Sequence, residues 1–295
     1  MMNAGDRLPG TPEPMHLWPG ADGLRIAADC WGDPSDPLIV LVHGGGQSRH
    51  AWASTGRTLG AAGWHAVAFD LRGHGDSDWA PDADYSLDAY VRDLQALLRR
   101  LGGCRPVLVG ASLGASAALI AAGEGAVHAG ALIMVDFVAR TEPAAFERNR
   151  SFMTAHGEGF GSLEEVANAI AAFRGGDSAQ RPARLDGLAR VVRRRADGRY
   201  QWHWDPRMIP WREREYPTRR QRMEVAARAL TAPLLLIRGG RSEVVSEEGA
   251  REFLALVPEA EYAVIEGAGH MIAGDRNDSF GHAAGPFLER LRARM

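Results

Sequence analysis

Short apolar runs recur along the chain, separated by polar and glycine-rich segments. Each run has the length of a strand that is covered on both faces, which reads as a continuous apolar stretch. A further segment, 14–31, contains the turn Gly20-Ala-Asp-Gly23 and predicts a hairpin, whereas residues 1–13 are expected to be disordered. The apolar runs predict strands at about residues 37–42, 64–69, 106–110, 130–135, 233–238 and 260–265.

Helical patterns lie between these strands. After Ser86, which can cap a helix, apolar residues recur at helical spacing from Leu87 to Leu101. Strands that alternate with helices predict an α/β fold, with a mostly parallel central sheet and helices on both faces.

The alternation stops between about residues 140 and 230. This stretch has helical patterns, an arginine-rich segment from Arg181 to Arg199 and the aromatic cluster Tyr200-Gln-Trp-His-Trp-Asp-Pro206. We therefore expect a core domain formed by residues 1–139 and 231–295, with residues 140–230 inserted into it.

Composition limits the remaining choices. A chain of 295 residues with 45% hydrophobic residues can form one such domain with an insertion. It has no apolar run of about 18 residues and no basic segment followed by an apolar one at the N-terminus, so we expect a cytoplasmic protein without a membrane partner. The net charge of −3, without a basic stripe interleaved with aromatic residues, argues against nucleic-acid binding. Cys30 and Cys104 lack metal or redox spacing and are expected to be small buried residues.

A candidate nucleophile stands at a strand-to-helix corner. The segment Gly110-Ala-Ser-Leu-Gly114 directly follows an apolar run and directly precedes a run of small residues. Glycines two positions before and after Ser112 allow strand and helix to approach closely, and the strained corner exposes the serine hydroxyl.

Two more segments carry groups that such a serine needs. Near the C-terminus a strand runs into Glu266-Gly-Ala-Gly-His270, which places His270 on a loop after Ser112 in the chain. Near the N-terminus a strand ends in His43-Gly-Gly-Gly46, whose N–H groups can converge on a developing negative charge.

With the segment Asp70-Leu-Arg-Gly-His-Gly-Asp-Ser77 after the next strand, the chain resembles α/β-hydrolases of the serine-esterase type over nearly its whole length. The resemblance implies that residues 140–230 form a mainly helical cap over the active site. Some members of the family have Asp or Cys in place of the serine and attack other substrates. Ser112 argues that this chain belongs to neither of these two classes.

The chemistry of a serine nucleophile assigns the remaining roles. His270 would take the proton of Ser112, and the N–H groups of Gly45 and Leu113 would bind the oxyanion. We expect hydrolysis of a carboxylic ester or thioester, and a small-molecule acyl substrate as the partner. The alternative functions that stay open are hydrolysis of a lactone or a carbon–carbon bond, perhydrolysis and, remotely, a non-catalytic ligand receptor. A homodimer also stays open. No metal or organic cofactor is implied.

Two residues are candidates for the acid that completes a catalytic triad with Ser112 and His270. Most members of the family carry this acid after the strand at 233–238, on a loop that reads Gly-x-x-Asp. Counted from Gly239, this spacing places Ser242 at the acid position, and counted from Gly240 it places Glu243 there. A branch similar to short-chain acyl-ester hydrolases places the acid one strand after the nucleophile, which is Asp136 here. We favour Asp136 and keep Glu243 as the alternative.

The aromatic cluster supplies a candidate substrate contact. Trp202 and Trp204 either pack the insertion onto the core or line the acyl pocket, and Trp204 is the residue we assign to substrate binding. Alternation along an extended segment would turn His203 away from both tryptophans. His43 is expected to support the glycine loop by hydrogen bonding.

Overall fold

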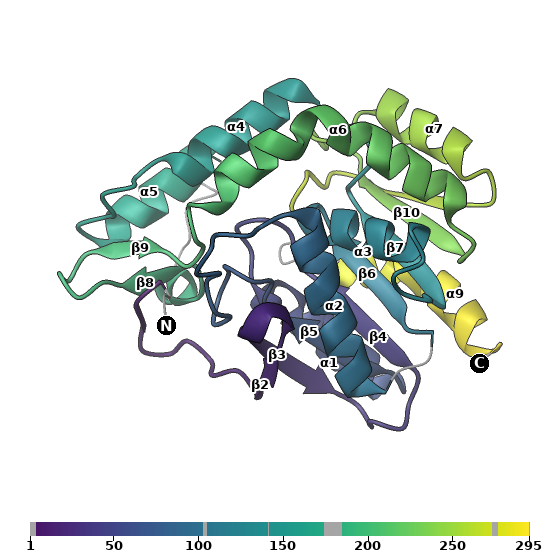
Figure 1. Ribbon diagram of the computed structural model, residues 1–295, viewed down its shortest axis with the longest axis horizontal. Coiled ribbons are helices and arrows are strands. Elements are labelled where there is room, and N and C mark those ends of the chain that lie inside the picture. The colour runs from purple at the N-terminus through teal and green to yellow at the C-terminus, as the bar shows by residue number, and fades with distance from the viewer. Residues whose placement is uncertain (1–3, 103–104, 141, 174–184, 273–276, 295) are drawn as a thin grey trace.

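A sheet of eight strands forms the centre of the computed structural model (Figure 1), which describes residues 4–102, 105–140, 142–173, 185–272 and 277–294. The strand order is β11-β10-β7-β6-β4-β5-β3-β2. The six strands from β11 to β5 in this order are parallel, and the β2–β3 hairpin is antiparallel at the edge. The strands are β2 (His16–Pro19), β3 (Arg25–Trp31), β4 (Leu38–Val42), β5 (His65–Phe69), β6 (Val107–Ala111), β7 (Ala131–Val135), β10 (Leu234–Gly239) and β11 (Glu261–Ile265).

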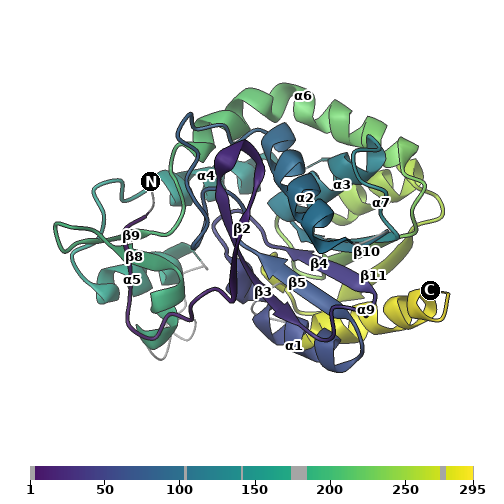
Figure 2. The same ribbon diagram turned by 60° about the horizontal axis from the view of Figure 1, so that its bottom comes forward.

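Both faces of this sheet are covered (Figure 2), which confirms the predicted fold class. In β4, Val40 and Val42 enter the core beneath α2 and α3, whereas Ile39 and Leu41 enter the opposite core beneath α1 and α9. This alternation explains why the strands read as continuous apolar runs. The helices of the core are α1 (Ala53–Ala61), α2 (Leu87–Leu101), α3 (Leu113–Gly123), α7 (Glu247–Leu256) and α9 (Asn277–Arg292), with short 3-10 turns η1 (Ala21–Gly23) and η2 (Arg49–Trp52).

Helix α2 begins where the sequence predicts. The Ser86 hydroxyl accepts a hydrogen bond from Ala89 N at 3.1 Å, and Gly102 ends the helix in the left-handed conformation with φ 63°. Its buried face contributes Leu94 and Leu97 to the core.

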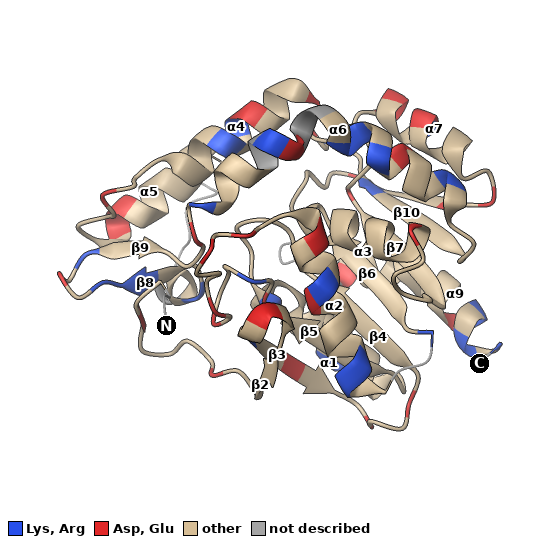
Figure 3. Ribbon diagram, in the orientation of Figure 1, with Lys and Arg blue, Asp and Glu red and all other residues tan. Residues whose placement is uncertain are grey.

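A long insertion separates β7 from β10 and lies across the carboxyl ends of the parallel strands (Figure 1). It combines helices with an antiparallel hairpin. Figure 3 shows both acidic and basic residues on its helices α4 and α6. Its elements are α4 (Pro143–Thr154), α5 (Leu163–Phe173), η4 (Leu185–Arg190), β8 (Val192–Arg194), β9 (Tyr200–Trp202) and α6 (Met208–Ala229).

The expectation of disorder over residues 1–13 is wrong for the part of this segment that the structure describes. Strand β1 (Asp6–Arg7) pairs with β8 and completes a three-stranded sheet with the hairpin of the insertion. The Thr11 hydroxyl donates a hydrogen bond to Ala189 O at 2.7 Å. Backbone pairing along an edge strand holds this segment, and such pairing leaves no apolar pattern in the sequence.

Cys30 in β3 is half-buried and unpaired rather than fully buried, and burial raises the pKa of its thiol to about 12. Cys104 lies outside the described residues. Among the helices that the structure describes, none combines the length and the apolar character that crossing a membrane requires.

Candidate active site

Ser112 occupies the corner between β6 and α3 in a strained backbone conformation, with φ 46° and ψ −108°. A Cβ atom on Gly110 would lie 2.5 Å from Ala115 N, and one on Gly114 would lie 2.4 Å from Val42 O. Only glycine fits at either position. The Gly-x-Ser-x-Gly spacing is therefore a packing requirement of this corner.

Asp136 follows β7 and is fully buried, with its side chain directed at the loop that carries His270. Its Oδ2 atom lies 2.7 Å from His270 Nδ1. Gly239 N donates to Oδ1 at 2.8 Å, and the Ser242 hydroxyl donates to Oδ2 at 2.5 Å. A carboxylate at Nδ1 favours the tautomer that carries its proton there, so Nε2 is left as an acceptor.

Glu243 lines the site on the same side as His270 but is bonded to another residue. Its carboxylate accepts a hydrogen bond from Arg148 of α4, and its side chain is 42% exposed. Of the two acids that the sequence leaves open, the structure therefore brings Asp136, and not Glu243, to His270.

The glycine loop after β4 has two of its N–H groups already bonded. Gly44 N donates to Gln47 Oε1 at 2.9 Å, and Gly46 N donates to His74 Nε2 at 3.2 Å. Within the described chain, the N–H groups of Gly45 and Leu113 make no hydrogen bond. These are the two donors that the sequence assigns to the oxyanion.

His43 holds this loop against the neighbouring turn. Its Nδ1 donates to Gly44 O at 2.7 Å, and its Nε2 accepts from Leu71 N at 3.0 Å. Burial lowers the pKa of His43, so the ring is neutral and can make both bonds. The expected supporting role of His43 agrees with these contacts.

A buried ion cluster fixes the same turn. The Arg49 guanidinium contacts the carboxylates of Asp29, Asp70 and Asp76 at 2.7–3.0 Å. Asp76 also pairs with Arg193 of β8 at 2.9 Å, so the cluster connects the core to the insertion. Although burial opposes the charge, Arg49 holds the pKa of Asp70 well below its usual range.

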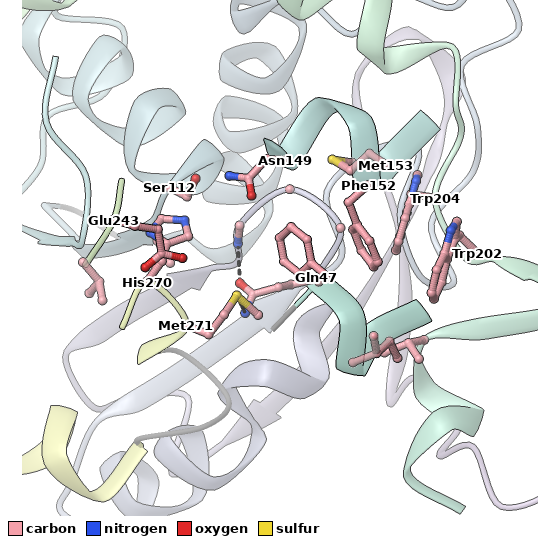
Figure 4. Close-up of a pocket in the computed structure, with 18 residues that line it drawn as sticks. Gln47, Ser112, Asn149, Phe152, Met153, Trp202, Trp204, Glu243, His270 and Met271 are labelled. Carbon is pink, nitrogen blue, oxygen red and sulfur yellow. Dashed lines mark hydrogen bonds between the residues drawn. The ribbon is translucent and has the colours of Figure 1, made fainter. Parts of the chain in front are cut away.

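Ser112 and His270 open into a cavity of about 160 Å³ between the core and the insertion. Figure 4 shows these two side chains at one end, together with Glu243, and an aromatic group at the other. The aromatic end is built from Phe152, Trp202 and Trp204, in which the two tryptophan rings stack at 4.8 Å. The remaining lining residues are Gly44, Gly45, Gly46, Gln47, Ala111, Val135, Asn149, Met153, Ile170, Phe173, Val191 and Met271.

His203 does not line this cavity, as the alternation predicts, but its ring still packs edge-on against Trp204, with the ring centres 5.3 Å apart. Its Nδ1 accepts a hydrogen bond from Gly75 N at 2.8 Å in the buried turn beneath the insertion. Burial, together with the nearby Arg193 charge, lowers the pKa of His203 well below its usual value.

Sequence reasoning missed the contribution of α4. Asn149 and Phe152 both face the cavity, and Figure 4 places Asn149 on the Ser112 side of Phe152. Residues three positions apart lie on the same face of a helix. A helix predicted over this part of the chain would therefore place Asn149 and Phe152 on one face. The sequence also gives no sign of the hydrogen bond that the Ser242 hydroxyl donates to Asp136.

Known proteins resemble the chain over most of its length. The family model for the alpha/beta hydrolase fold matches residues 37–276. An esterase of Mycobacterium tuberculosis is 28% identical over 270 residues, which cover 85% of this chain and 82% of that protein. An N-formylmaleamate deformylase of Pseudomonas putida is 27% identical over 272 residues, covering 91% and 94% of the two chains.

Solved structures agree with the match. The crystal structure of an alpha/beta hydrolase from Novosphingobium aromaticivorans has a TM-score of 0.74 and 26% sequence identity, and the match covers 93% of this chain and 97% of that one. Since the family model spans more than half of the residues and the strand order agrees with the predicted fold, the chain belongs to the alpha/beta hydrolase fold family.

Proposed function

We propose that the protein is a serine hydrolase that cleaves a carboxylic ester or thioester through an acyl-enzyme. Ser112 is the nucleophile, His270 the general base and acid, and Asp136 the residue that orients His270. The observation that carries this proposal is the 2.7 Å contact between Asp136 Oδ2 and His270 Nδ1 at the same cavity end as a serine in a strained corner.

In the first half-reaction, His270 Nε2 accepts the Ser112 proton while Oγ attacks the acyl carbon. The carbonyl oxygen becomes an oxyanion, which the Gly45 and Leu113 N–H groups stabilise by about 3 kcal/mol per donor. The bond to the alcohol or thiol then breaks, and that group takes the proton from His270. Water repeats these steps on the acyl-enzyme and releases the carboxylic acid.

We infer the orientation of the substrate from the two ends of the cavity. His270 must reach the leaving-group atom as well as Ser112, so the leaving group lies on the His270 side. The acyl group then extends toward Phe152, Trp202 and Trp204, at the far end. We infer that residues 140–230 act as a cap that selects apolar acyl groups larger than acetyl, with Trp204 in contact with them.

A fluorophosphonate probe followed by peptide mass mapping tests the nucleophile. We expect one adduct, on Ser112, and none in the Ser112→Ala variant. An adduct on another residue, or no adduct in folded protein, would refute the assignment of Ser112 as the nucleophile. A panel of esters, thioesters, lactones and amides of graded acyl length, with Ser112→Ala as the blank, identifies the bond that is cleaved.

A further inference from the structure

A chain of contacts leads from the insertion to the nucleophile turn. Arg219 of α6 places Nη2 2.5 Å from the Ser116 hydroxyl. That hydroxyl lies 3.1 Å from the backbone oxygen of Ser112, which also accepts a hydrogen bond from Ser116 N at 3.0 Å. Ser116 is fully buried, one helical turn after Ser112.

The direction of each bond in this chain follows from the groups involved. A guanidinium has only donors, so Arg219 donates to Ser116 Oγ. The single hydroxyl proton of Ser116 is then directed to the Ser112 oxygen. The Ser112 carbonyl therefore accepts two hydrogen bonds. One of them comes from the Ser116 hydroxyl, which itself accepts a hydrogen bond from the positively charged Arg219.

The Ser112 carbonyl belongs to the same peptide unit as the Leu113 N–H. Hydrogen bonds to one end of a peptide polarise it and strengthen the donor at the other end. They also fix the plane of the peptide, and with it the direction in which the Leu113 N–H points. The contacts of Ser116 thus act on a group that would bind the oxyanion.

We propose that Arg219 is a positioning residue for the oxyanion hole and acts through Ser116 on the Leu113 N–H. This proposal rests on the serine-hydrolase function proposed above. It gives the insertion a role in the reaction in addition to shaping the cavity, because α6 supplies Arg219.

Two features hold Arg219 in place. Its guanidinium carbon lies 5.9 Å from the ring centre of Phe137, the residue after Asp136, within the range of a cation–π contact. Helix α3 also approaches α6 closely, since a Cβ atom on Gly123 would lie 2.2 Å from Ala226 O. Glycine at this crossing lets the two helices come near enough for Arg219 to reach Ser116.

The test compares Arg219→Gln and Ser116→Ala with the matched control Arg222→Gln. Arg222 lies on the same helix and pairs with Asp88 and Glu124 of the core, so its loss also removes a cation and an insertion–core contact. For an ester substrate, we expect kcat to fall about threefold to tenfold in Arg219→Gln and Ser116→Ala, with little change in KM, and to stay unchanged in Arg222→Gln.

Binding of a trifluoromethyl ketone provides a readout that a merely structural contact would not change. Addition of Ser112 to this inhibitor creates an oxyanion in the same place, so its Ki should rise by the factor that kcat loses. Arg219→Lys, which keeps the charge, should recover part of the loss. The double variant should be no worse than the poorer single variant, since both act through one chain.

Equal kcat and Ki values in Arg219→Gln and Arg222→Gln, or a change in KM alone, would overturn the proposal. If Arg219→Gln does not fold, Ser116→Ala decides, and unchanged kcat in that variant overturns it. Fluorophosphonate labelling of the wild type is measured in parallel. Labelled Ser112 with no effect of either variant refutes the role of Arg219 alone, whereas unlabelled Ser112 refutes the proposed function and this inference with it.

Discussion

The Oδ2 atom of Asp136 lies 2.7 Å from Nδ1 of His270, although 134 positions separate the two residues in the chain. Gly239 N and the Ser242 hydroxyl hold the same carboxylate from the neighbouring strand end. With both oxygens bonded, the carboxylate has one orientation, and that orientation directs a lone pair at the imidazole.

We expect Asp136→Asn to lower turnover by about 10⁴-fold, because an amide no longer selects the Nδ1–H tautomer or stabilises the imidazolium. Glu243→Gln is the comparison, since Glu243 lines the same cavity but pairs with Arg148. It should have a small effect. Steady-state kinetics on one ester substrate measures both, and a reversal of the two effects would assign the acid to Glu243.

Trp204→Ala should change the ranking of acyl groups more than it changes reactivity toward an acetyl ester. The indole stacks on Trp202 at the cavity end away from His270, where only a larger acyl group would reach. The measurement is kcat/KM over a series of acyl lengths, with the Tm of each protein as a control. Equal losses for all substrates at unchanged Tm would contradict a role in acyl selection.

His203 should make the protein less stable as the pH falls below the ordinary histidine value of 6.5. The folded state keeps this buried ring neutral, while the unfolded chain binds a proton at about that pH, so acid favours unfolding. His203→Asn retains an acceptor for Gly75 N but does not titrate. Between pH 6.5 and 5, its free energy of unfolding should therefore fall less steeply, by up to about 1.4 kcal/mol per pH unit.

Urea denaturation at a series of pH values measures this slope. His128→Asn is the control, because His128 is exposed. If both variants keep the wild-type slope, His203 does not contribute to the pH dependence.

Two glycine substitutions should have opposite effects on stability. Gly114→Ala places a methyl group 2.4 Å from Val42 O at the nucleophile corner and should lower the free energy of unfolding by several kcal/mol, about 3 or more. Gly281→Ala lies in α9 with nothing within 4 Å of the added carbon. It should stabilise the protein by about 0.5–1 kcal/mol. Urea midpoints decide, and similar shifts for both would contradict the packing argument at Gly114.

The strands β4, β5, β6, β7 and β10 were predictable from sequence because each is buried on both faces, whereas the edge strand β11 exposes Tyr262 and Val264. The predicted run at 130–135 and the observed β7 differ by one residue at the start, and the run at 106–110 is displaced by one residue from β6. The corner at Ser112 was predictable for a different reason, since its glycines are required by close backbone contacts.

Other features left no such signal. Strand β1 spans only Asp6–Arg7 and depends on the distant β8 for its hydrogen bonds. The bond from Ser242 to Asp136 joins two loops that the sequence separates by 106 positions. The contact between Arg219 and Ser116 depends on how α6 packs over α3, which helical periodicity alone does not determine.

The pairing of β1 with β8 has a consequence for modular exchange between relatives. Strand β1 begins the described chain, but its backbone partner β8 follows only after half of the core has been built. A chimaera that exchanges residues 140–230 alone would therefore separate β8 from the strand that completes its sheet. A transplantable unit must include the first dozen or so residues of the chain together with the insertion.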